Sequence, residues 1–175
     1  MMAEPRIRPR AGTMIVVSLL LLALGLAAFA VWFQWRQTRL CLGFYGADAA
    51  RRIQTSDRVE LWRLAWDGSR RRPVVAERLD VSRAGGLVHL RRGLVEDANF
   101  AWGDGGTGSR LPDGAWDEAL AFFEPAADAP ATVLAFDMDA PAAITVVGRP
   151  GRVTLGRIAA GFKTWIDATR TLARP

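Results

Sequence analysis

MIVVSLLLLALGLAAFAVWF, residues Met14–Phe33, runs for twenty residues without a charged side chain. A helix of this length is about 30 Å long, which matches the hydrocarbon thickness of a bilayer. Its twelve Leu, Ile, Val and Phe residues favour insertion by about 4 to 7 kcal/mol. An amphipathic core helix of a soluble protein carries a polar side, and this run has none. The sequence therefore predicts a transmembrane helix over residues 14–35, and hence the lipid bilayer as a partner.

The flanks of the run support a membrane segment in two different ways. Trp32 and Trp35, followed by Arg36 and Arg39, suit an interfacial belt, and residues 1–13 form a basic tail. Ala28-Phe29-Ala30 also resembles a signal-peptidase site, so cleavage after Ala30 and secretion of the remainder is the alternative. The apolar run continues through Val31–Phe33, which favours an uncleaved signal-anchor.

The charges beside the run bear on its orientation. Arg6, Arg8 and Arg10 precede it, whereas Arg36 and Arg39 follow it. The positive-inside rule then favours a cytoplasmic N-terminus. We expect a single-pass protein of the cell (inner) membrane with an extracytoplasmic C-terminal domain.

Beyond a juxtamembrane segment at 36–45, residues 46–175 have the length of one domain. Hydrophobic periodicity and turn residues predict helices and strands in the order α-β-β-α-β-β-β-α, with a short extended segment before the last helix. The expected helices are 46–54, 87–97 and a C-terminal helix whose apolar positions run from Ile158 to Leu172. The expected strands are 58–66, 74–82, 116–123, 132–138 and 142–147, and a short segment at 153–155 leads into the last helix. Hairpin-linked strands with separated helices indicate an α+β domain, with helices packed on one face of a small antiparallel sheet.

The net charge of +5 does not indicate a nucleic-acid partner. Lys163 is the only lysine among 23 basic residues, a pattern typical of GC-rich coding, and 18 acidic residues are interspersed with them. The lone cysteine, Cys41, excludes an intrachain disulfide and a cysteine-rich zinc site. We interpret it as a small buried apolar residue.

Few patterns suggest chemistry. Gly103–Gly108 fits G-x-G-x-x-G, but the residues after it cannot open a helix, so we interpret it as a loop. Asp137 and Asp139 resemble a cation-binding pair, yet further oxygen ligands are missing and a turn is favoured. The arginines at 70–72 are interpreted as a solvated turn. We therefore expect no metal, no cofactor and no enzymatic activity.

One group remains as a candidate ligand-binding site. His89 is the only histidine, and on a helix over 87–97 it shares a face with Arg92 and Glu96, opposite Leu87, Leu90 and Leu94. Such a trio could bind an anion or transfer a proton. A solvated face with an Arg92–Glu96 ion pair is the alternative.

Three stretches carry a family resemblance: RLCLGFYG (39–46), RVELWRL (58–64) and GLVHLRRGLVED (86–97). They resemble uncharacterised single-pass, membrane-anchored proteins of GC-rich bacteria such as planctomycetes, and the resemblance implies no activity. The expectation is a membrane-anchored, non-catalytic domain that contacts a protein partner at the membrane surface. The alternatives are a small ligand- or anion-binding sensor and a secreted domain.

Overall fold

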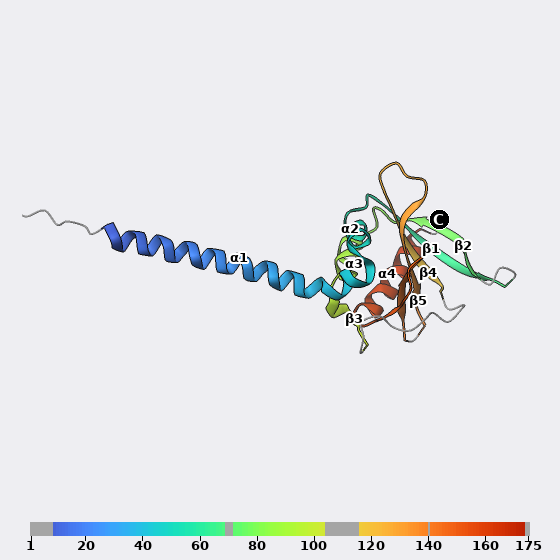
Figure 1. The fold of residues 1–175 in the computed structure, drawn as a ribbon. Coiled ribbons are helices and arrows are strands. Elements are labelled where there is room, and N and C mark those ends of the chain that lie inside the picture. Colours follow the sequence, from blue (N-terminus) through green and yellow to red (C-terminus); the bar gives the residue numbers. More distant parts are fainter. Residues whose placement is uncertain (1–8, 69–71, 104–115, 140, 174–175) are drawn as a thin grey trace, which may run out of the picture. The chain divides into compact units, whose positions relative to one another are not determined.

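The computed structural model of the chain describes residues 9–68, 72–103, 116–139 and 141–173 (Figure 1). The helices are α1 (Pro9–Tyr45), α2 (Ala47–Thr55), α3 (Leu87–Gly93), the 3-10 turn η1 (Asp97–Asn99) and α4 (Ile158–Leu172). The strands are β1 (Arg58–Asp67), β2 (Arg72–Asp80), β3 (Phe100–Ala101), β4 (Glu118–Phe123), β5 (Pro130–Asp137), β6 (Ala143–Val146) and β7 (Val153–Leu155). The chain divides into two compact units, Met1–Gln37 and Thr38–Pro175.

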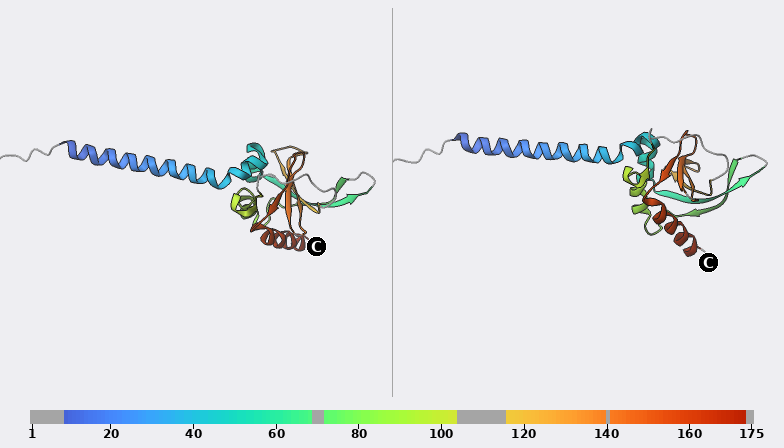
Figure 2. Two further views of the ribbon diagram at one scale, coloured as in Figure 1. Left: turned by 60° about the horizontal axis from the view of Figure 1, so that its bottom comes forward. Right: turned by 90° about the horizontal axis from the view of Figure 1, so that it is seen from below.

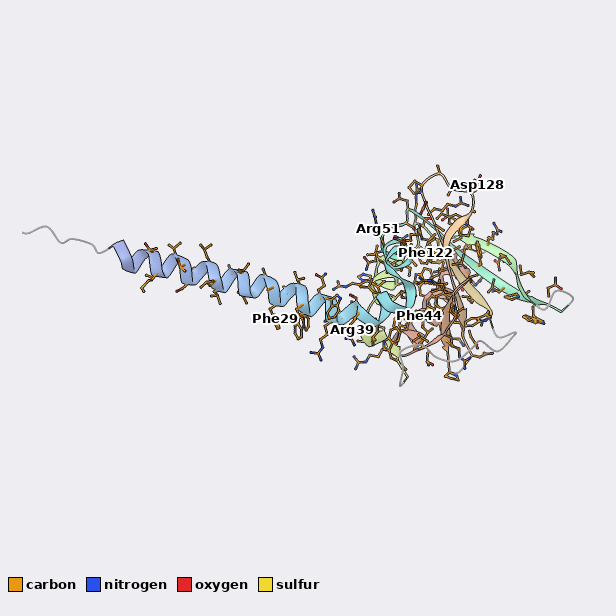
Figure 3. All side chains as sticks on the ribbon, viewed as in Figure 1. Phe29, Arg39, Phe44, Arg51, Phe122 and Asp128 are labelled. Atoms are coloured by element: carbon orange, nitrogen blue, oxygen red, sulfur yellow. The ribbon has the colours of Figure 1, made fainter. Side chains whose placement is uncertain are left out.

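The N-terminal unit is an exposed apolar helix. α1 has 37 residues, and from Gly12 to Tyr45 it is long and apolar enough to cross a membrane. The side chains of its most apolar stretch are exposed: Leu21 is 64% exposed and Phe29, labelled in Figure 3, is 60% exposed. A transmembrane span and a signal sequence both have this length and composition. The expected apolar helix is therefore present.

The second unit is built on one antiparallel sheet. Its seven strands, among the described residues, run in the order β2-β1-β4-β5-β6-β7-β3. β1 pairs with β2 on one side, joining Leu61 to Leu79, and with β4 on the other, joining Leu61 to Leu120. β2 and the two-residue β3 are the edges.

The two faces of this sheet are covered differently. One face packs against the helices in the main core, where Phe136 of β5 contacts Phe162 of α4 with ring centroids 4.4 Å apart. Phe122 lies in the same core and is fully buried (Figure 3). The opposite face has a smaller cluster of Trp62, Ala119, Ala121 and Phe123, to which the described helices add no residue. α4 runs along one side of the sheet (Figure 2), and the predicted α+β architecture is confirmed.

Several boundaries differ from those expected. α3 ends at Gly93, four residues before the expected end, because the Asn99 side-chain amide donates to the Gly93 carbonyl at 2.9 Å and the chain turns into η1. β3 was not predicted, since two residues show no periodicity. Gly151, after Pro150 in the turn between β6 and β7, has φ +101°, a backbone angle that favours glycine.

The folded core begins before residue 46, where the domain was expected to start. Cys41, Phe44 and Tyr45, at the end of α1, are at most 7% exposed. Two polar side chains hold this end of the helix. The Asp97 carboxylate accepts the backbone N–H groups of Leu40 and Cys41, and the Arg149 guanidinium donates to the Phe44 and Tyr45 carbonyls.

Candidate functional site

Of the predicted ligand-binding residues His89, Arg92 and Glu96, only Arg92 and Glu96 contact each other. His89 lies exposed on α3, and Arg92 and Glu96 form the expected ion pair, with 3.2 Å between Arg92 Nε and Glu96 Oε1. Because α3 ends at Gly93, Glu96 lies in extended backbone and not on the helix face with His89. The Arg92 side chain is 82% exposed. The structure thus joins two of the three residues and leaves their surroundings open to solvent.

A hollow lies between the end of β2 and α4. It has a volume of about 540 Å³. Its lining comes from β2, from the connection to α3 and from α4: Leu79, Asp80, Ser82, Arg83, Ala84, Gly85, Trp165, Ala168, Thr169, Leu172 and Ala173. We call this hollow the β2–α4 groove. Its volume is in the range of ligand pockets.

Trp165 and Leu172 give the β2–α4 groove its apolar wall. The Trp165 indole Nε1–H donates to the Gly85 carbonyl at 2.8 Å, which fixes the ring against the β2–α3 connection. Leu172 is 88% exposed, whereas Trp165 is partly buried and packs against the main core.

The connection beside the groove is held by its own polar groups. Asp80 Oδ1 accepts the backbone N–H of Ser82 at 2.9 Å and the Ser82 hydroxyl at 2.6 Å. These hydrogen bonds lower the pKa of the Asp80 carboxyl, so Asp80 is ionised at neutral pH. The rim of the groove therefore carries a negative charge at Asp80 and a positive one at Arg83.

An ion-pair network secures α4 next to the groove. Arg170 of α4 donates to Glu118 of β4 at 2.5 Å and to Glu77 of β2 at 2.9 Å. Burial raises the pKa of the Glu118 carboxyl, and the Arg170 charge opposes that shift. The Arg170 and Glu118 side chains are only 8% and 12% exposed. This network ties α4 to β2 and β4, and so fixes the walls of the groove.

The other patterns singled out in the sequence form turns or packing contacts, or fall outside the residues that the structure describes. Asp137 Oδ1 accepts the Asp139 N–H at 3.1 Å, the geometry of a turn, and no group of three potential metal ligands occurs in the described residues. The Gly-rich segment beyond Gly103, Arg70, Arg71 and the tail with Arg6 and Arg8 lie outside the described residues. Arg78 stacks over Trp62, its guanidinium carbon 5.0 Å from the ring centroid.

The architecture is that of an α+β protein with a long apolar N-terminal helix and an open groove beside one sheet edge. No family model, no curated protein and no solved structure matches the chain.

Proposed function

We propose that this chain is a single-pass membrane protein whose α+β domain is extracytoplasmic and makes non-catalytic protein contacts at the membrane surface. One observation carries the anchor: the side chains of Met14–Phe33 are exposed along their whole length. In water this surface has no partner, and a bilayer core is the solvent that suits it.

The β2–α4 groove supports protein contacts over chemistry. Its walls are apolar side chains, and Leu172 extends from them into solvent. Apolar surface with charges at its rim is typical of protein interfaces. His89 is not among the residues that line this groove.

The anchor is tested by fractionation of cells that express the full chain with a reporter enzyme fused at Pro175. We expect the protein in the alkali-washed membrane pellet, at its full-length mass, with the reporter active on the extracytoplasmic side. Leu21→Arg/Leu22→Arg should move it to the soluble fraction, because two central arginines oppose insertion by about 5 to 7 kcal/mol. Val88→Arg/Val147→Arg, on exposed domain residues, is the matched control and should stay in the pellet.

Secretion after cleavage is the second candidate, and Ala28-Phe29-Ala30 is the observation that favours it. It predicts a soluble product shorter by about thirty residues, and conversion to the full-length form in the variant Ala28→Leu/Ala30→Leu. The anchor predicts the same mass for both proteins. A shortened wild-type protein in the extracytoplasmic soluble fraction would overturn the anchor.

A small ligand- or anion-binding sensor is the third candidate. The volume of the β2–α4 groove favours it, as does the exposed Arg92–Glu96 pair near His89. It predicts that His89→Ala/Arg92→Ala abolishes ligand or partner binding. Unchanged binding in that double variant would exclude the His89–Arg92–Glu96 version of this function.

A further inference from the structure

β2 has an open edge in the part of the chain that the structure describes. It is the terminal strand of the sheet and pairs with β1 alone. Val81 N–H donates to the Val59 carbonyl, so the hydrogen-bonded pairs with β1 continue at Leu79 and Glu77. The backbone N–H and C=O groups of Arg78 and Asp80 therefore point away from β1, toward the free edge. An unpaired row of this kind is a template for another strand.

The side chains along this edge alternate in character. Arg78 and Asp80 lie on the face of Trp62, and both are exposed. Leu79 lies on the opposite face, where it is half-buried and forms part of the β2–α4 groove. The strand thus presents a positive and a negative charge on one face, and an apolar residue beside an apolar groove on the other.

We propose that the occupant of this edge is β2 of a second copy of the chain, paired antiparallel about a two-fold axis at Leu79. In that register Leu79 meets Leu79 of the other copy, and Arg78 of each copy lies opposite Asp80 of the other. The neighbouring two-fold registers centred on residues 78 and 80 place Arg78 opposite Arg78, or Asp80 opposite Asp80. Charge complementarity therefore selects one register.

The groove explains why a second copy fits better than an unrelated peptide. A two-fold axis perpendicular to the sheet places both α4 helices on the same face of the joined sheet. Leu79, at the axis, also lines the β2–α4 groove, so the grooves of the two copies adjoin and one contact covers both the open strand edge and the apolar lining beside it. The inference deepens the proposed function by naming its protein partner, and it rests on that function for the shared membrane, which concentrates the copies.

The test is a disulfide that only the proposed register can form. Opposed residues of a non-hydrogen-bonded antiparallel pair have Cα atoms about 4.5 Å apart, within the range of a disulfide. We expect full-length Leu79→Cys to give a covalent dimer on mild oxidation in membranes. Val88→Cys, which is exposed on α3, and the wild type should not. Cys41 is fully buried, and burial raises the pKa of its thiol, so it adds no background.

A second measurement remains informative if Leu79→Cys fails to fold. Light scattering of the full-length chain in detergent should give the mass of a dimer. Arg78→Glu, which places two negative charges opposite each other at both symmetric positions, should weaken that dimer about tenfold. Arg51→Glu makes the same charge change on exposed α2 (Figure 3) and should leave the dimer unchanged.

Two results would overturn the inference. One is a monomer in detergent with no Leu79→Cys dimer in membranes; the other is a Leu79→Cys adduct formed with a different protein only. Neither result affects the fractionation and the reporter assay, so the dimer can fail while the anchor stands. A chain that is found in the soluble fraction and still dimerises would contradict the anchor and leave the dimer intact.

Discussion

The Asp97 carboxylate joins two parts of the domain that are far apart in sequence. Its two oxygens accept the N–H groups of Leu40 and Cys41 at 2.9 and 2.8 Å, and its carbonyl accepts the Trp102 indole N–H at 2.8 Å. In an uninterrupted helix the N–H groups of Leu40 and Cys41 bind carbonyls four residues earlier. The carboxylate thus holds the last turns of α1 to η1, more than fifty residues away in sequence.

Asp97→Ala should lower the free energy of unfolding of the second unit by about 2 kcal/mol, because two charge-assisted hydrogen bonds are lost from a half-buried site. Denaturant titration of the full chain in detergent, followed by tryptophan fluorescence, measures the change. Asp128→Ala removes an exposed carboxylate on the β4–β5 loop (Figure 3) and should change stability little. Equal effects of the two substitutions would contradict the role given to Asp97.

Asp117 is the residue whose environment predicts a dependence on pH. Its Oδ1 accepts the Met138 N–H at 3.1 Å. Burial raises the pKa of the Asp117 carboxyl, the Met138 hydrogen bond opposes this shift, and Asp137 and Asp139 add to it. The folded state therefore binds the proton more tightly than the unfolded state does. The corresponding stability is complete below the unfolded pKa and is lost as the pH rises through the folded pKa.

Asp117→Asn keeps the acceptor for Met138 and removes the titration. Relative to the wild type it should therefore gain stability as the pH rises from about 4 to about 7, where its amide avoids the buried charge. Since Asp117 is half-exposed, we expect a gain below about 1 kcal/mol. Unfolding free energies at both pH values measure it, with Asp128→Asn as the control. A gain on acidification would contradict the sign.

At the scale of elements, the junction of α1 and α2 depends on a glycine and an arginine. Gly46 has φ +77°, and a Cβ atom there would lie 2.6 Å from Arg149 Nη1. Arg149 in turn donates to the carbonyls of Phe44 and Tyr45, the last two residues of α1. Only a residue without a side chain allows both this positive-φ backbone and the guanidinium cap.

Gly46→Ala should destabilise the domain by about 1 to 2 kcal/mol because alanine is strained at this positive φ. The clash between the new Cβ atom and Arg149 should add a second cost. In an Arg149→Ala background the clash disappears, so the second cost of Gly46→Ala should be smaller. Gly161→Ala, in α4 with open space around its Cβ, should instead stabilise by about 0.5 to 1 kcal/mol. Additive effects of Gly46→Ala and Arg149→Ala would contradict the contact.

Elements with strong local patterns could be predicted from the sequence, and those defined by long-range contacts could not. α4 was located because its helical periodicity lies within fifteen consecutive residues. The end of α3 depends on Asn99 and on Ile158, whose side chain packs against Gly93, and neither contact has a local signature. The β2–α4 groove was missed for the same reason, since Leu79 and Trp165 meet only after folding.

At the scale of the whole molecule, the chain combines two units suited to different solvents. The helix over residues 14–33 is exposed and apolar, whereas the second unit buries Phe122, Phe136 and Phe162 in its core. Under the proposed membrane anchoring, the side of the membrane on which the second unit lies depends on the charges that flank the apolar run.

The balance of these charges gives the last prediction. The tail has Arg6, Arg8 and Arg10, and the other flank has Arg36 and Arg39. Replacing the three tail arginines by alanine leaves the positive charge on the C-terminal flank, so a substantial fraction of the protein should insert with its domain in the cytoplasm. Arg36→Ala/Arg39→Ala should instead strengthen the original orientation. Reporter activity at Pro175 measures both, and a tail variant with unchanged orientation would mean that the arginines do not determine the topology.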